Sequence, residues 1–256
     1  MNEVLRCENV SIQFGGLKAI DNLNMHINSG ELLGLIGPNG AGKTTVFNMI
    51  SGEYSPTEGK IYLCGEKING LRPHILVKKG IARTFQNIRL FGYLSALENV
   101  KVACNKDMSY SIPEGMLRMP KYWSEEKNKS LEALKILDIM GLKHLADAPA
   151  KSLSYGDQRK LEIARALATK PKLLLLDEPA AGMNPNETMS LMYTIETIRD
   201  RFGITVLLIE HDMNLVLGIC ERLMVLNYGK TLAVGKPNEV VNNKDVITAY
   251  LGNGGD

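Results

Sequence analysis

The sequence predicts an α/β fold in which helices cover both faces of a mainly parallel β-sheet. Strand-like and helix-like segments alternate through the C-terminal half, as in proteins whose parallel strands are joined by helices. The strand-like segments are short aliphatic runs without polar alternation, which is typical of strands buried on both faces. The expected elements are, in chain order, a helix at Gln158–Thr169, a strand at Leu173–Leu176, a helix at Glu187–Arg201, a strand at Ile204–Ile209, a helix from Met213, a hairpin around Tyr228-Gly229 and a short C-terminal helix.

The N-terminal third has a different pattern, which predicts an antiparallel β subdomain. Between Asn22 and Asn28 polar and apolar residues alternate, as they do in a strand with one buried face. Turn-forming residues precede two further expected strands, Leu32–Ile36 and Lys60–Leu63. We assign residues 1–93 and 150–256 to a core that includes this subdomain, within a single domain of 256 residues.

The middle of the chain, from about residue 94 to residue 170, is expected to form a helical subdomain. Helix-forming residues dominate it, most clearly at Glu125–Met140. Within it the segment Asp107–Trp123 contains two prolines, a glycine and the only tryptophan of the chain. We expect this segment to be an irregular insertion.

The composition is that of an ordinary globular protein. A net charge of +2, from 30 basic and 28 acidic residues, gives no reason to expect nucleic acid as a partner. The N-terminus lacks a basic region followed by an apolar stretch, and no window approaches the ~18 apolar residues of a membrane-spanning helix. We therefore expect a cytoplasmic protein that reaches a membrane only through partners. Four cysteines, far apart in sequence, predict neither a disulfide framework nor a zinc site: Cys7, Cys64, Cys104 and Cys220.

The strongest local signal is the glycine-rich segment that follows the strand Leu32–Ile36. Residues Gly37-Pro38-Asn39-Gly40-Ala41-Gly42-Lys43-Thr44 match the phosphate-loop pattern G-x-x-x-x-G-K-[ST] at every position. The glycines allow backbone N–H groups to point into one concavity, to which a helix N-terminus adds positive potential. We expect Lys43 to bind the β and γ phosphates of a nucleotide and Thr44 to offer a hydroxyl to Mg²⁺.

Two other nucleotide-binding patterns do not fit the chain. A dinucleotide-binding G-x-G-x-x-G that begins at Gly40 would need a third glycine where the chain has Thr45. A GTPase would carry Asn-Lys-x-Asp to recognise guanine, and neither Asn105-Lys106 nor Asn243-Lys244 is followed by an aspartate at that spacing.

Acidic residues at the end of a second aliphatic strand predict the hydrolytic part of the site. Asp177 and Glu178 directly follow Leu173–Leu176, and ligands bind at the carboxyl ends of the strands in open α/β sheets. We expect Asp177 to hold Mg²⁺, usually through water, and Glu178 to act as general base toward the attacking water. His211 follows the next aliphatic strand, Thr205–Ile209, and is a candidate for contact with the γ-phosphate.

A third motif carries a resemblance to a known family. The run Leu153-Ser154-Tyr155-Gly156-Asp157-Gln158 precedes a helical segment and is similar to the Leu-Ser-Gly-Gly-Gln signature of ABC-transporter ATPases. A serine N-cap followed by a glycine at a helix start is by itself an anion-binding arrangement. The chain resembles the ATP-binding subunit of an ABC transporter over nearly its whole length, about Val4 to Gly252. The resemblance implies a P-loop NTPase (RecA-like) fold and the hydrolysis of ATP with Mg²⁺.

The resemblance also implies roles for individual residues. Ser154 and Gly156 would contact the γ-phosphate held by an opposing subunit, so that a head-to-tail dimer encloses two ATP molecules. Gln86 would contact the metal and the attacking water and link the two subdomains, and Phe14 would stack on adenine. The implied nucleotide-binding residues are Phe14, Gly37, Pro38, Asn39, Gly40, Ala41, Gly42, Lys43, Thr44, Thr45, Ser154 and Gly156. The implied catalytic residues are Glu178, His211 and Gln86, and the implied metal ligands are Thr44, Gln86 and Asp177.

Three positions depart from the family pattern. Tyr155 replaces the first glycine of the signature and Asp157 replaces its glutamine. Asn184 replaces the aspartate of a loop whose usual sequence in the family is Ser-Ala-Leu-Asp. Because Ser154 and Glu178 are retained, we still expect hydrolysis, and the departures bear on how the two subunits are coupled.

Within the family, the chain is most similar to the larger ATPase of branched-chain amino acid importers. That similarity lies in Ala82–Phe91, Leu153–Gly156, Asp177–Pro185 and the tail Asp245–Gly252. It implies three partners: transmembrane permease subunits, a second ATPase subunit that is a copy or a paralogue, and indirectly a solute-binding protein. ATP binding would close the dimer and move the permeases, and hydrolysis would reset it.

Other functions remain open from the sequence. One is an ATPase of another importer, of the amide, urea or lipid-related kind; another is a soluble family member that acts on DNA or ribosomes. DNA-repair members carry a very long coiled coil between the glutamine and the signature, which is absent from this sequence, and ribosome-acting members carry two cassettes. A P-loop kinase is a third alternative, against which the signature argues.

Overall fold

The computed structural model describes residues 3–104 and 120–251, which form two compact units. The first unit contains the residues up to Gln86 and from Lys172 onward, and the second unit runs from Asn87 to Pro171. In the described ranges, none of the helices combines the length and the apolarity that crossing a bilayer requires.

The first unit is built on a six-stranded sheet, which confirms the predicted α/β class. Its strand order is β10 (Lys230–Gly235), β9 (Arg222–Asn227), β3 (Leu32–Ile36), β8 (Thr205–Ile209), β7 (Leu173–Asp177) and β6 (Ile81–Arg83). All neighbours are parallel except β9 and β10, which form the predicted hairpin. The loops that follow β3, β6, β7 and β8 therefore leave the sheet at the same edge.

A second, antiparallel sheet in this unit confirms the expectation for the N-terminal third. Its order is β2 (Leu17–Asn28), β1 (Glu3–Phe14), β4 (Glu58–Leu63) and β5 (Glu66–Lys67). In β2 the apolar residues Leu23, Met25 and Ile27 are buried between more exposed neighbours, as the alternation predicts. β1 was not predicted, because several register shifts interrupt the alternation along it.

The core of the first unit joins both sheets through helix α1 (Lys43–Ile50). Leu173 and Leu175 of β7 belong to the same apolar cluster as the antiparallel strands, whereas the equally buried Leu174 and Leu176 do not. The parallel strands are thus buried on both faces, as predicted, because successive side chains of a strand point to opposite faces. The side chains of α1 in the cluster are Val46, Phe47, Met49 and Ile50.

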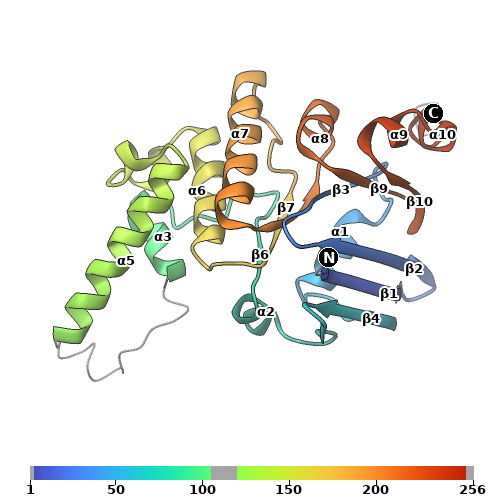
Figure 1. Cartoon of the computed structure of the whole chain (residues 1–256), viewed down its shortest axis with the longest axis horizontal. Helices are drawn as coiled ribbons and strands as arrows, with labels where there is room; N and C mark the ends of the chain where they lie inside the picture. The colour runs from blue at the N-terminus through green and yellow to red at the C-terminus, as the bar shows by residue number, and fades with distance from the viewer. Residues whose placement is uncertain (1–2, 105–119, 252–256) are drawn as a thin grey trace. The chain divides into compact units, whose positions relative to one another are not determined.

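Further helices cover the other face of the parallel sheet. Helices α7 (Pro185–Phe202) and α8 (Met213–Ile219) lie on the side away from the antiparallel sheet (Figure 1). Both were expected, and the short C-terminal helix is present as α9 (Pro237–Val241) and α10 (Lys244–Leu251). The short helix α2 (Pro73–Lys79), ahead of β6, was not predicted.

The second unit is helical, as expected for this part of the chain. It contains α3 (Ala96–Cys104), α5 (Pro120–Ile139) and α6 (Tyr155–Leu167), which lie together in Figure 1, and the 3₁₀ turns η2 (Lys143–Leu145) and η3 (Ala150–Ser152). The expectation of an irregular segment up to Trp123 is wrong for its last four residues, which form the first turn of α5. A proline is tolerated at the first helical position because its missing N–H would have no partner there. Residues 107–119 lie outside the described residues.

Candidate functional site

The phosphate loop connects β3 to α1 and depends on glycine at both ends. Gly42 is the N-cap of α1 in a left-handed conformation, with a φ of 103°, and a Cβ there would lie 2.5 Å from Ile20 Cδ1. At Gly37, a Cβ would lie 2.1 Å from the carbonyl oxygen of Leu226 in β9. A side chain at Gly37 would have to displace strand β9, and one at Gly42 would need a strained left-handed backbone and movement of the Ile20 side chain, which explains the residue types.

The β9–β10 hairpin supports the phosphate loop from the side. The N–H of Gly229, at the hairpin tip, donates to the carbonyl of Ala41 over 3.0 Å, and the Gly229 carbonyl accepts from Asp21 N–H over 2.9 Å. Desolvation raises the pKa of the Tyr250 phenol in α10, and a hydrogen bond that it accepts from the backbone of Gly37 acts in the opposite direction. The C-terminal segment therefore contacts both ends of the loop.

Lys43 is buried and lies within the loop. Its Nζ donates to the carbonyl oxygens of Gly37 and Pro38 over 2.7 and 2.9 Å. Burial lowers the pKa of Lys43, and the negative charges of Glu178 and Asp177 act in the opposite direction. The structure thus places the predicted phosphate-binding lysine in the field of the two predicted acids.

Asp177 ends strand β7 with a buried side chain. Its Oδ2 accepts a hydrogen bond from Nη2 of Arg83 over 2.8 Å, and its N–H lies 3.4 Å from the Thr84 hydroxyl. The arginine was not predicted as part of the site, since an arginine at the end of a short strand gives no sequence signal by itself.

Glu178 contacts the two other predicted catalytic residues, Gln86 and His211. Its Oε2 accepts from Nε2 of Gln86 over 2.8 Å, and its Oε1 lies 2.8 Å from Nε2 of His211. Its φ of 47° is in the left-handed region, which is rare for a residue with a side chain and is found at functional sites. The structure therefore brings Gln86, Glu178 and His211 together, from the loops after β6, β7 and β8.

Glu210 organises the same loops and was not predicted. It is buried, and its carboxylate accepts from the N–H groups of Ala180, His211 and Asp212 over 2.7, 2.9 and 3.3 Å. Burial raises the pKa of Glu210, while these three amides act in the opposite direction. Because one carboxylate holds the backbone on both sides of the site, it helps to fix the positions of Glu178 and His211.

Phe14 ends strand β1, and 44% of its surface is exposed. Its ring contacts Tyr54 edge-to-face, with centroids 5.2 Å apart. The second aromatic residue follows α1 in the chain and was not predicted as a neighbour of Phe14.

The signature segment belongs to the second unit, whereas all the residues above belong to the first. Ser154 is the N-cap of α6, as predicted, because its Oγ accepts from the N–H of Asp157 over 3.1 Å. The Ser154 hydroxyl in turn donates to Oδ2 of Asp157 over 2.7 Å. Tyr155 is 43% exposed, and its ring lies over the buried guanidinium of Arg159 at 5.9 Å.

Asn184 has a structural role at the start of α7. Its side chain accepts from the N–H of Glu187 and the Glu187 side chain accepts from the N–H of Asn184, both over 3.0 Å. This reciprocal pair is a capping box, in which asparagine and aspartate are about equally effective. The departure from aspartate is therefore compatible with the helix start.

The donor groups near the phosphate loop suit Mg²⁺. Thr44 offers a hydroxyl, Asp177 a carboxylate and Gln86 an amide oxygen, and Mg²⁺ prefers such oxygen ligands together with water and nucleotide phosphates. Asp177 and Glu178 act electrostatically on Lys43 of the phosphate loop, and a divalent cation would offset the charge of these acids beside nucleotide phosphates.

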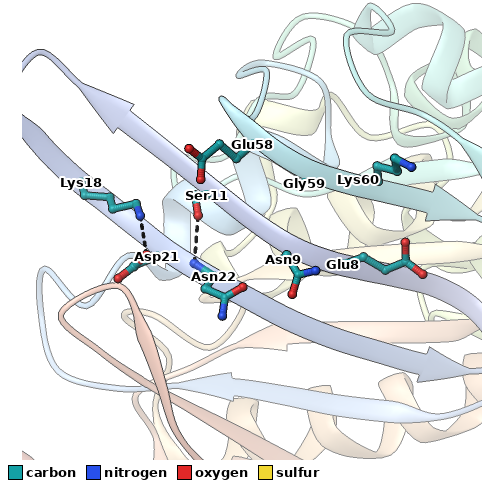
Figure 2. Close-up of a pocket in the computed structure, with 9 residues that line it drawn as sticks. All are labelled: Glu8, Asn9, Ser11, Lys18, Asp21, Asn22, Glu58, Gly59 and Lys60. Carbon is teal, nitrogen blue, oxygen red and sulfur yellow. Dashed lines mark hydrogen bonds and ion pairs between the residues drawn. The ribbon is translucent and has the colours of Figure 1, made fainter.

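A polar depression of about 420 Å³ lies on the antiparallel sheet and shares no residue with this site. Figure 2 shows Lys18 directed at Asp21, with which it forms an ion pair, and the N–H of Asn22 donating to the Ser11 hydroxyl over 2.9 Å. Lys230 also pairs with Asp21, over 3.3 Å. Within the lining Lys18 and Asp21 neutralise each other, Glu8 pairs with Arg6 outside it, and we assign the depression no role.

Comparisons with known proteins agree with this arrangement. A model of the ABC transporter family matches residues 20–181, and a model described as branched-chain amino acid ATP-binding cassette transporter matches residues 230–256. The chain is 44% identical over 249 residues to the high-affinity branched-chain amino acid transport ATP-binding protein BraF of Pseudomonas aeruginosa. The aligned region covers 97% of this chain and 98% of that protein. Identity to LivG of Escherichia coli, which has the same description, is also 44%, with the same coverage.

Solved structures give the same result for the fold. The ADP conformation of MJ1267, an ATP-binding cassette of an ABC transporter, superimposes with a TM-score of 0.85 at 33% identity, covering 98% of this chain and 100% of that chain. The dimeric structure of MJ0796, a bacterial ABC transporter cassette, superimposes with a TM-score of 0.76 at 29% identity, covering 91% and 98%.

Proposed function

Because the chain belongs to the ABC transporter family, we propose that it is the ATP-hydrolysing subunit that powers an importer of branched-chain amino acids. The proposal of ATP hydrolysis rests on one observation: Glu178 is hydrogen-bonded to Gln86 and His211 and interacts electrostatically with the buried Lys43. The amino acid part is supported by the family model that matches residues 230–256 and by the description of BraF.

In the proposed reaction, the phosphate loop from Gly37 to Thr45 holds the phosphates of ATP, and Lys43 turns its ammonium from the loop carbonyls to the β and γ phosphates. Thr44, Asp177 and Gln86 would hold Mg²⁺, which would neutralise charge on the transferring phosphoryl group. The adenine would lie against Phe14. These roles are consistent with the oxygen-bearing side chains named above and with the buried ammonium group of Lys43 in the first unit.

Glu178 is the proposed general base. It accepts a proton from a water molecule, whose oxygen attacks the γ-phosphorus while the bond to the β–γ bridging oxygen breaks and ADP leaves. Gln86 and His211 hold the carboxylate oxygens over 2.8 Å each, so the base is oriented before the water arrives. During the reaction His211 would donate to the γ-phosphate.

Ser154 and Gly156 are proposed to complete the nucleotide site of an opposing ATPase subunit, either a copy or a paralogue. The N-terminal N–H groups of α6 and the Ser154 hydroxyl form an arrangement that favours an anion. The dimeric cassette MJ0796 supports an assembly of two ATPase subunits. In this proposal each chain is a single cassette, with a core and a helical subdomain at about residues 94–170.

The proposed partners in the membrane are transmembrane permease subunits, with a solute-binding protein outside. The chain would then lie on the inner face of the cell membrane through these partners. ATP binding closes the dimer and changes the permeases, and this coupling requires that ATP bind the closed state more tightly than the open one.

Transport by the assembled complex tests this function. The chain is coexpressed with the permeases, second ATPase and binding protein of its genetic neighbourhood, reconstituted into vesicles, and assayed for ATP-dependent uptake of labelled leucine, isoleucine and valine. We expect uptake of these, no uptake of urea or acetamide, and loss of uptake with Lys43→Ala. ATP-dependent uptake of an amide instead would contradict the proposed substrate, and stable association with ribosomes or DNA without permeases would contradict transport.

A further inference from the structure

Arg83 connects the predicted metal ligand Asp177 to the helix that follows the phosphate loop. Its Nη2 donates to Oδ2 of Asp177 over 2.8 Å, while its Nη1 donates to Oδ1 of Asn48 over 2.7 Å and to the hydroxyl of Ser51 over 3.1 Å. One guanidinium therefore joins the end of β6, the end of β7 and the last turn of α1.

The surroundings of this guanidinium restrict its position. Its side chain is 8% exposed and that of Asp177 is 7% exposed, so the ion pair is largely removed from water. The rings of Phe47 and Phe85 lie near it, with centroids 5.6 and 5.1 Å from Cζ. Its Nε is buried and has no hydrogen-bond partner among the described residues.

A buried ion pair loses more hydration free energy than a surface pair. Because this loss offsets the attraction between the charges, the pair contributes little net free energy to folding. A planar fork that donates to two different acceptors does, however, fix the orientation of a carboxylate. Outer-shell partners that orient a metal ligand typically change metal affinity by about 10- to 100-fold when removed. The arrangement is thus better suited to positioning Asp177 than to stabilising the fold.

We propose that Arg83 is a positioning residue for Mg²⁺: it holds one oxygen of Asp177 and ties it to α1, so that the carboxylate is oriented toward the metal of Mg–ATP. This inference rests on the proposed function, since it requires nucleotide and metal at the site. Arg83 also precedes Gln86 by three residues, so the same bridge anchors the start of the segment that carries the glutamine.

Lysine and glutamine substitutions separate charge from geometry. Arg83→Lys keeps the positive charge but carries its donors on a single nitrogen, so it lacks the planar fork that bonds Asp177 from one nitrogen and Asn48 from the other. Arg83→Gln removes the charge and keeps one donor. Arg199→Gln is the matched control, because Arg199 also joins separate segments, with a 3.0 Å bond from α7 to Glu221 just before β9, and its ion pairs are with Glu221 and Asp200, not with site residues.

Two measurements are made. Binding of a fluorescent ATP analogue without metal is followed in EDTA, and binding of Mn²⁺, used in place of Mg²⁺, is followed by electron paramagnetic resonance over a metal titration. We expect both Arg83 variants to bind the analogue in EDTA as the wild type does, while the half-saturating Mn²⁺ concentration rises about 10- to 100-fold. The spectrum of the bound ion should shift toward that of free Mn–ATP. Arg199→Gln should match the wild type in both measurements.

Several outcomes would overturn the proposal. An unchanged Mn²⁺ titration for both variants would show that Arg83 does not act on the metal, and full retention of metal affinity by Arg83→Lys would contradict the bridge. A loss of binding that is equal with and without metal, in variants whose thermal unfolding is unchanged, would show a general effect on the nucleotide site. Failure of the wild type to bind the analogue at all would instead contradict the proposed function.

Discussion

The two halves of the proposed nucleotide site, the acids around Glu178 and the signature around Ser154, are held in different ways. Glu178 is bonded to Gln86 and His211, which are 92 and 33 residues away in the sequence. Ser154 bonds to Asp157, three residues away at the start of the same helix. The first half is thus assembled by tertiary contacts, and the second by local capping of a helix whose N-cap Ser154 and first residue Tyr155 are exposed.

This difference indicates what each half needs in order to act. The acids are oriented within one chain, so their chemistry should be lost by changes within that chain alone. Ser154 is oriented before any partner is present, and its proposed function lies in contact with another subunit. Four substitutions test this contrast, beginning with the one of largest expected effect.

Glu178→Gln should lower the ATP turnover number by roughly 10²- to 10⁴-fold, the usual contribution of a general base. The amide cannot accept the proton, but it has nearly the same shape, so ATP binding should persist and a closed dimer should accumulate. Steady-state hydrolysis together with size-exclusion chromatography in ATP measures both properties. A turnover number near that of the wild type would show that another group takes the proton.

Ser154→Ala should weaken ATP-driven dimerisation roughly 10- to 100-fold, since a hydrogen bond to a charged group is worth about 1.5–3 kcal/mol. ATP binding by the monomer should change little, because in the proposal this hydroxyl contacts the nucleotide of the other subunit. Analytical ultracentrifugation with ATP, in the Glu178→Gln background that prevents turnover, separates the two effects.

Two controls accompany the Ser154 measurement. Ser154→Thr retains a hydroxyl and an N-cap and should retain dimerisation, while Ser152→Ala removes a nearby hydroxyl that donates to the Pro149 carbonyl within its own turn. Equal weakening of monomer binding and of dimerisation by Ser154→Ala would contradict the division of the site between two chains.

Asn184→Ala should destabilise the protein by about 0.5–2 kcal/mol, the usual cost of losing an N-cap. The substitution removes the acceptor for Glu187 N–H and half of the capping box at α7. Asn184→Asp should fold as stably as the wild type, because aspartate caps equally well. Urea denaturation of the two variants measures the difference, and an unchanged midpoint for Asn184→Ala would show that the cap contributes nothing.

Asp157→Asn should have the smallest effect, with opposite signs for stability and for dimerisation. An acidic residue in the first turn stabilises a helix by about 0.3–1 kcal/mol, so the variant should be less stable by that amount. The same negative charge should repel an approaching γ-phosphate, so ATP-driven dimerisation should become a few times tighter. Weaker dimerisation would mean that Asp157 serves the partner contact and not only the Ser154 hydroxyl.

Much of the first half could be predicted because its signals are local. The phosphate-loop glycines, the aliphatic run before Asp177 and the strand before His211 each specify an element and the residue at its end. That all these strands are parallel neighbours in one sheet then brings their ends together. The predicted roles of these residues stay predictions, while their proximity around Glu178 is observed.

The residues that support the site could not be predicted, because their partners are distant in sequence. Arg83 donates to Asp177, which lies 94 residues further along the chain. Glu210 accepts from the N–H of Ala180, which lies 30 residues before it. Neither contact leaves a periodic or spaced pattern in the chain. The helical start of α5 was missed for the opposite reason: Pro120 interrupts most helices, but it is compatible with the first position of one.

The support of the phosphate loop by the β9–β10 hairpin has a consequence for synthesis of the protein. The loop ends near residue 44, but the Gly229 amide that bonds to Ala41 and the two strands that flank β3 come from the last third of the chain. Since ribosomes add about 5–20 residues per second, the loop emerges roughly 10–40 s before the hairpin, which lies about 190 residues later. A nascent chain therefore cannot complete the supported phosphate loop while that loop is emerging from the ribosome. Competence to bind ATP arises only after the hairpin has been synthesised, which delays ATP-driven assembly with a second copy until that point.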